Sequence, residues 1–180
     1  MRRNRSLLVA LATVAAAALV AAVASADDGG RKGDDDQGKN GRGDDAAKIF
    51  SAALAPSMPG DPSVHGVAPG GVPWVLKRGR VQLAASGKIK VELRGLVIPI
   101  AHGTFPANTA LPVTTVSASL YCAPDAAAAA ATTASAPISP DGDARITDTL
   151  TLPATCLAPT VLVHPNGGLG AYIALPGWRS

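Results

Sequence analysis

The stretch Gly79–Leu96, GRVQLAASGKIKVELRGL, decides the fold class of this chain. Two runs in which apolar and polar residues alternate flank a short segment that contains Gly87. Such alternation is typical of strands with one buried face, and a glycine between two alternating runs is typical of a hairpin turn. The stretch therefore predicts two adjacent antiparallel strands.

The polarity pattern also selects the length of this turn. A two-residue loop would pair Leu83 with Lys90 and so mix apolar and charged side chains on one face. A three-residue loop, Ala85–Gly87, pairs like with like; the resulting pairs are Leu83 with Ile89, Val81 with Val91 and Arg80 with Glu92. Because a shift of one residue moves every side chain to the other face, we predict the three-residue loop, with Gly87 in the left-handed conformation.

The rest of residues 48–180 repeats this pattern of short alternating runs separated by Pro and Gly. We predict strands over 48–54, 79–85, 88–98, 113–122, 132–138, 143–152, 159–164 and 170–175. Short strands at regular spacing with turn residues between them are typical of an antiparallel sandwich or barrel. We therefore predict an all-β domain over 48–180, an Ig-like or Greek-key β-sandwich of about eight strands.

Two places in this domain leave alternatives open. Asp148 interrupts the apolar face of its strand, so either a bulge turns it outward or its carboxylate accepts hydrogen bonds from loop backbone. Ala126–Ala131 is interpreted as a loop that leads into a strand, because so short a helix is marginal. A helix capped by Asp125 is the alternative there.

Cys122 and Cys156 are the only cysteines, and we predict that they form a disulfide. A bond between them would close a loop of about 34 residues and stabilise the fold by roughly 3–4 kcal/mol. The alternative, a reactive thiol, lacks the C-x-x-C spacing of redox motifs.

The N-terminus has the layout of an export signal. Three arginines precede an apolar run over Leu7–Ala24, and Ala24-Ser25-Ala26 offers small residues for cleavage. We predict a signal peptide over 1–26 and a secreted protein, either free or associated with the cell envelope, with no stable membrane insertion after cleavage. An uncleaved anchor is the alternative, since the run approaches the length that spans a bilayer.

Residues 27–47 contain seven Asp, many Gly and no large apolar side chain. Such a segment cannot bury enough surface to offset its ordering entropy, so we predict a disordered linker. Asp36, Asn40, Gly41 and Asp44 match part of a calcium loop, but Ala47 stands where the bidentate carboxylate belongs. Arg42-Gly43-Asp44 matches an adhesion tripeptide that this composition produces easily.

Charge and composition exclude several classes of function. The formal charge of the whole chain is +3. Loss of Arg2, Arg3 and Arg5 with the signal peptide would leave equal numbers of acidic and basic residues. Because the mature chain would then carry no excess of positive charge, we expect no nucleic-acid partner. The chain has no G-x-S-x-G turn and no phosphate-binding glycine loop. We predict a protein that is not an enzyme and carries no cofactor.

Two groups of residues remain as candidates for a site. Six cations surround the hairpin against Glu92 alone; they are Lys77, Arg78, Arg80, Lys88, Lys90 and Arg94. They are interpreted either as a solvated outer face or as a contact for an acidic cell-envelope polymer. The three histidines, His65, His102 and His164, are weak candidates for a metal site or a hydrolase, because no spacing forces them together. We expect them to be exposed loop residues.

The chain resembles exported, Ala-rich bacterial proteins in its hairpin motif, which reads Gly79-x-Val81-x-Leu83 and continues as Ser86-Gly87-x-Ile89-x-Val91-x-Leu93-x-Gly95-Leu96. In those proteins a Cys-bearing strand and a Pro-Asp-Gly-Asp-Ala turn follow the hairpin, and the corresponding turn here is Pro140–Ala144. That resemblance implies no activity. The chain is also similar to the CHRD domain in three places, which are Phe50–Leu54, the hairpin and Ala101-His102-Gly103. The CHRD domain usually carries a His-x-His pair, of which only His102 is present here. The leading hypothesis is a non-enzymatic binding or structural component of the cell envelope, and the alternative is a secreted metal-binding protein or hydrolase that uses the histidines.

Overall fold

Residues 47–124 and 128–179 are described by a computed structural model of the chain. The predicted signal peptide, the linker up to Ala46, the partial calcium loop and the adhesion tripeptide lie outside these residues, as do Asp125–Ala127. Within the described ranges, no helix is long and apolar enough to cross a membrane.

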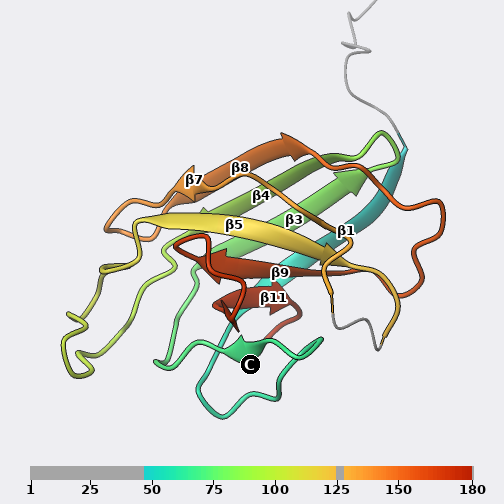
Figure 1. Ribbon diagram of the computed structural model, residues 1–180. Coiled ribbons are helices and arrows are strands. Elements are labelled where there is room, and N and C mark those ends of the chain that lie inside the picture. Colours follow the sequence, from blue (N-terminus) through green and yellow to red (C-terminus); the bar gives the residue numbers. More distant parts are fainter. Residues whose placement is uncertain (1–46, 125–127, 180) are drawn as a thin grey trace, which may run out of the picture. The chain divides into compact units, whose positions relative to one another are not determined.

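The secondary structure of these ranges consists of strands joined by turns and loops (Figure 1). The strands are β1 (Lys48–Pro56), β2 (Ala68–Pro69), β3 (Arg78–Ala84), β4 (Lys88–Arg94), β5 (Thr115–Tyr121), β6 (Ala131–Thr132), β7 (Ala136–Pro137), β8 (Ala144–Thr149), β9 (Thr160–Pro165), β10 (Ala171–Tyr172) and β11 (Ala174–Pro176). The predicted all-β, antiparallel class is confirmed. The predicted strand 132–138 is divided into β6 and β7, and residues 128–130 form loop before β6.

Nine strands form one sheet in the order β6-β5-β9-β11-β1-β3-β4-β8, with β7 paired to β5. This sheet curls back on itself as a half-barrel, so that β5 crosses in front of β3 and β4 in Figure 1. The two ends of one curled sheet thus take the place of the two layers of a sandwich. The remaining strands, β2 and β10, pair in parallel as a small second sheet.

The hairpin of β3 and β4 has the predicted register. Leu83 is opposite Ile89, Val81 is opposite Val91, and Arg80 is opposite Glu92. Gly87 has a φ of 85°, and its N–H donates to the carbonyl of Ala84 over 2.9 Å. The rule that apolar residues share one face therefore determined both the loop length and the pairing.

The two ends of the sheet meet between β8 and the segment that contains β6 and β7. Ile138, just after β7, forms a bridge with Ala144, and the turn between them is closed by the N–H of Gly142 donating to the carbonyl of Ser139. Farther along β8, the carboxylate of Asp148 accepts a hydrogen bond from the N–H of Ala134 over 2.8 Å. Asp148 thus accepts hydrogen bonds from loop backbone, which was one of the two alternatives left open by the sequence.

The concave side of the sheet holds the main core, in which the side chains of Val81, Ile89, Val91, Leu93 and Val161 have no exposed surface. A second cluster lies on the convex side of β5 and β9 and contains Val67, Tyr121, Leu162 and Tyr172. Val64 and Val67 belong to the loop that carries β2, so this loop covers the outer face of one half of the sheet. The outer face of β3, β4 and β8 carries no second cluster of this kind among the described residues.

Cys122 and Cys156 form the predicted disulfide. Cys122 directly follows β5, and Cys156 lies in the segment between β8 and β9. The bond therefore ties this long segment to the end of a central strand, and no cysteine of the chain is left free.

Candidate functional site

The predicted cations gather on the convex face of β3 and β4 because both strands alternate. Val81, Leu83, Ile89, Val91 and Leu93 point into the core, so the residues between them point outward. The cations placed outward in this way are Arg78, Arg80, Lys88, Lys90 and Arg94. Lys77 is exposed immediately before β3. We call this surface, together with the outward residues of β8, the basic face.

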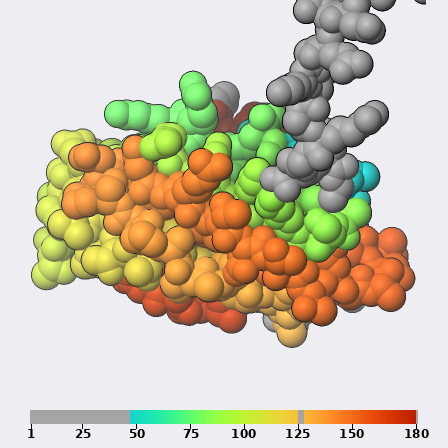
Figure 2. Space-filling model, turned by 90° about the horizontal axis from the view of Figure 1, so that it is seen from above, coloured from blue at the N-terminus to red at the C-terminus, as the bar shows by residue number. Residues whose placement is uncertain are grey.

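Strand β8 adds a cation that sequence reasoning missed. Arg145 is opposite Glu92 in the pairing of β4 with β8, and one of its guanidinium nitrogens lies 3.7 Å from a Glu92 carboxylate oxygen. Figure 2 shows the orange segment of β8 beside the green segment of β3 and β4 on this side of the molecule. Only the pairing of strands far apart in the chain brings Arg145 to the basic face, and no local pattern signals it.

Among the described residues, three carboxylates neighbour these seven cations, namely Glu92, Asp141 and Asp143. Asp143 accepts hydrogen bonds of 2.9 Å from the N–H of Gly95 and from the Arg94 guanidinium. These two hydrogen bonds, the backbone one first, lower the pKa of Asp143 and keep it ionised. Glu92 and Arg145 are both more than half exposed, so their ion pair adds little stability.

The carboxylates are unevenly distributed. Asp141 and Asp143 line a surface depression of about 630 Å³ together with Lys77 and Arg94, so charge is balanced at that end. Cations continue along the hairpin from that end, with Arg78 opposite Arg94, Arg80 opposite Glu92, Lys90 opposite Gln82 and Lys88 next to the turn. Glu92 is the one acidic residue among the outward positions of β3 and β4. This arrangement can hold anionic groups, since it presents several cations in one plane.

The three histidines lie in different surroundings. His65 stacks on Tyr121 with ring centroids 4.6 Å apart, and His102 is exposed in a tight turn with Phe105. His164 is fully buried in β9, so the expectation of an exposed loop residue is wrong for it. The His164 ring lies against Ala171 of β10, and the sequence of β9 alone did not reveal this contact. No group of three His, Cys, Asp or Glu side chains able to hold a metal occurs in the described part of the chain.

His164 has a neighbour that the sequence did not suggest. Ser117 is its cross-strand partner on β5, and the Ser117 hydroxyl and His164 Nε2 are both buried without a hydrogen-bond partner among the described residues. His164 Nδ1 lies 2.8 Å from the carbonyl oxygen of Ala171. Burial lowers the pKa of His164, although the Ala171 carbonyl acts in the opposite direction. The pair has neither a carboxylate behind the imidazole nor access to solvent, which a hydrolytic serine and histidine require.

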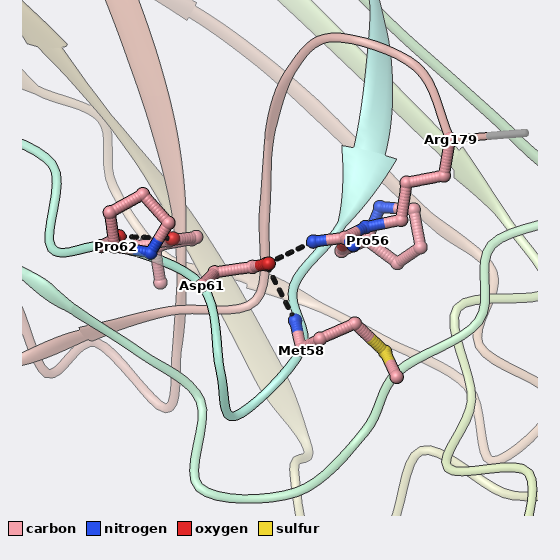
Figure 3. A network of polar contacts seen from close by, with 6 residues as sticks. Pro56, Met58, Asp61, Pro62 and Arg179 are labelled. Carbon is pink, nitrogen blue, oxygen red and sulfur yellow. Dashed lines mark hydrogen bonds and ion pairs between the residues drawn. The ribbon is translucent and has the colours of Figure 1, made fainter.

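A separate polar network ties down the C-terminal end of the chain (Figure 3). Asp61 accepts hydrogen bonds from the N–H of Met58, over 2.8 Å, and from the Arg179 guanidinium. Arg179 also donates to the carbonyl of Pro56 over 2.9 Å. Burial alone would raise the pKa of Asp61, but the hydrogen bonds from Arg179 and Met58 and the Arg179 charge outweigh it and lower the pKa. All of these groups are paired with one another, so the network serves to anchor the chain.

Comparisons with known proteins return no relative of this chain. No protein-family model, no curated protein and no solved structure matches it. The resemblances to exported Ala-rich proteins and to the CHRD domain therefore remain predictions, and function is argued from the geometry of the chain alone.

Proposed function

We propose that this chain is a secreted, non-enzymatic binding protein whose basic face contacts an acidic polymer of the cell envelope. The observation that carries the proposal is the gathering of seven cations beside three carboxylates on one outward sheet face. The N-terminal export pattern and the disulfide between Cys122 and Cys156 support an oxidising compartment outside the cytosol.

The spacing of the cations suits a polymer better than a single small anion. Outward residues on one strand are two positions apart, which corresponds to about 7 Å. Neighbouring strands lie about 4.8 Å apart. The outward cations therefore form an open grid of positive charge that extends along the hairpin, with Arg78 and Arg80 on β3 and Lys88, Lys90 and Arg94 on β4. A chain with repeated negative charges can contact several points of this grid at once.

Fluorescence anisotropy with labelled poly-L-glutamate tests the proposal, with labelled neutral dextran as the control polymer. The wild type should bind poly-L-glutamate at low ionic strength and release it in 1 M salt, where the Debye length falls to about 3 Å. The triple variant R78Q/R80Q/K90Q should bind at least tenfold more weakly at low salt. Dextran should not bind to either protein.

Two matched variants separate charge from a general effect of mutation. R78K/R80K keeps the charges and should bind like the wild type, whereas E92Q removes a carboxylate from the basic face and should bind more tightly. A wild-type protein that does not bind poly-L-glutamate at low salt, or a folded triple variant that binds equally well, would overturn the proposal.

A further inference from the structure

A surface hollow of about 310 Å³ lies beside the last residues that the structure describes. Much of its lining is apolar, with contributions from Val64, Tyr172, Leu175 and Pro176. Among the described residues that line it, two are charged, and these are Asp61 and Arg179, the ion pair drawn in Figure 3. Because the two charges cancel, the hollow favours an uncharged ligand over an ion.

The pair that anchors the C-terminal end leaves one acceptor and one donor for a ligand. The hydrogen bonds that described residues donate to the Asp61 side chain all fall on Oδ2. Arg179 donates from Nε to the Pro56 carbonyl and from Nη2 to Asp61. Asp61 Oδ1 can therefore accept a further hydrogen bond and Arg179 Nη1 can donate one. The contacts already made hold both groups in place, so their free atoms are oriented before a ligand arrives.

Trp178 lines the same hollow and is held at its edge by its neighbours. The N–H of Gly177 donates to the carbonyl of Ala53 over 3.0 Å, and the Arg179 side chain donates to the carbonyl of Pro56. The residues on either side of Trp178 are thus tied to β1, yet Trp178 itself is 89% exposed. A large aromatic ring presented in this way at a concave surface offers a platform on which a flat apolar face can stack.

A pyranose sugar carries both kinds of surface that the hollow offers. The C–H face of its ring is apolar and can stack on an indole, and neighbouring substituents at its rim can donate and accept hydrogen bonds. An acetamido substituent adds an amide N–H and a methyl group, and the methyl group suits the apolar lining around Val64 and Leu175. A volume of 310 Å³ equals that of about ten water molecules in the liquid, which is room for one sugar unit.

We propose that this hollow binds one N-acetylhexosamine unit of an uncharged glycan. The sugar ring stacks on Trp178, its amide N–H donates to Asp61, and a neighbouring hydroxyl accepts from Arg179. The site does not depend on the proposed function of the basic face, because none of the seven cations of that face lines the hollow.

Calorimetric titration of the exported chain with tetra-N-acetylchitotetraose tests the site. Binding should be saturable, with one ligand per chain. Cellotetraose has the same linkage but hydroxyls in place of the acetamido groups, and it should bind about fivefold more weakly or worse, since it lacks the methyl and the amide N–H. No saturable binding of tetra-N-acetylchitotetraose, or an equal affinity for cellotetraose, would overturn the proposal.

Tryptophan fluorescence reports where the glycan binds. Trp74 is 2% exposed and Trp178 is 89% exposed, and the chain has no other tryptophan. The glycan should therefore shift the emission to shorter wavelength and protect it from acrylamide, because it covers Trp178. Saturable binding that leaves the emission and the quenching unchanged would place the glycan elsewhere and refute the site.

Variants test the stacking contact directly. W178A should keep the wild-type melting temperature and bind the glycan about tenfold more weakly, whereas W178F should lose less. I100A removes another exposed apolar side chain, outside the lining, and should bind like the wild type. The variant R78Q/R80Q/K90Q should also bind like the wild type, which separates this site from the basic face. A folded W178A that binds like I100A, or a higher affinity of the wild type for a polyproline peptide than for the glycan, would contradict the proposal.

Discussion

The carboxylate of Asp148 on β8 accepts a hydrogen bond of 2.8 Å from the N–H of Ala134, which lies between β6 and β7. Asp148 is opposite Ile89 on β4 and so belongs to the inward-facing row of its strand. At this position the two ends of the curled sheet meet without a backbone ladder between them. The Asp148 side chain therefore accepts a hydrogen bond that, in a continuous sheet, a backbone carbonyl of a neighbouring strand would accept.

Asp148→Asn should lower the free energy of unfolding by about 1 kcal/mol, since a partly exposed hydrogen bond to a charged acceptor is replaced by a weaker neutral one. The N–H groups of Ala134 and Thr149 lower the pKa of Asp148. Its ionised form therefore contributes stability above pH 3.8 that is lost as the pH falls through the lower pKa of the folded state. Urea unfolding at pH 7 and pH 3 should show a larger difference between wild type and variant at pH 7. Asp141→Asn, on an exposed turn, is the matched control and should change little.

His164 predicts a second dependence on pH, in a higher range. Burial lowers its pKa in the folded protein, so below about pH 6.5 the unfolded chain binds a proton more readily than the folded one. Stability should therefore decrease as the pH falls from 6.5 towards 5, by at most about 1.4 kcal/mol per pH unit. Asn at position 164 retains a donor in place of Nδ1 and cannot be protonated, so H164N should flatten this part of the curve. The exposed His102 gives the control H102N, which should keep the wild-type slope; an unchanged slope in H164N would contradict the prediction.

Gly87 should not tolerate a side chain. Its φ is 85°, and a Cβ at this position would lie 2.1 Å from the carbonyl oxygen of Leu150. Gly87→Ala should therefore cost about 2 kcal/mol or more in unfolding free energy, from backbone strain and from displacement of the segment that follows β8. Gly60 has no atom within 4 Å of such a Cβ, and G60A should stay within about 0.5 kcal/mol of the wild type. Equal melting temperatures for the two variants would count against this account of the turn.

Loss of the disulfide should be the largest single change. Cys122 and Cys156 are 34 residues apart, and in the chain-entropy treatment the bond stabilises the fold by roughly 3–4 kcal/mol. The double variant C122A/C156A should show this decrease in guanidinium unfolding. Dithiothreitol should lower the stability of the wild type to about the same level and leave the double variant unaffected. The double variant controls for other effects of the reductant, and its difference from the reduced wild type measures the change in side-chain packing.

Local patterns predicted the longer strands and the hairpin register, but neither β2 nor the division of residues 132–138 and 170–175 into two short strands each. Leu83, Ile89 and Val91 share one face because any other pairing would bury Lys90, and this constraint acts over a few residues. The pairing of β4 with β8, which places Arg145 beside Glu92, joins segments about fifty residues apart. Nothing in either segment specifies the other, so the full extent of the basic face could not be predicted.

The convex side of β5 and β9 shows the same limit in the core. Ser117, Ser119 and His164 alternate with apolar residues and so have the pattern of a solvated face, yet all three are buried. The hydrogen-bond partners of two of them come from distant segments: the Ser119 hydroxyl lies 2.9 Å from that of Thr132 on β6, and His164 Nδ1 lies 2.8 Å from the Ala171 carbonyl oxygen on β10.

The covalent link between Cys122 and Cys156 has a consequence for a protein exposed to proteases. A cut anywhere between these residues, for example in the exposed stretch Pro153–Thr155, leaves two pieces that remain joined through sulfur. Nicked molecules would then migrate as one species in a gel without reductant and as two after reduction. Cleavage in this exposed segment would thus not release either piece of the chain.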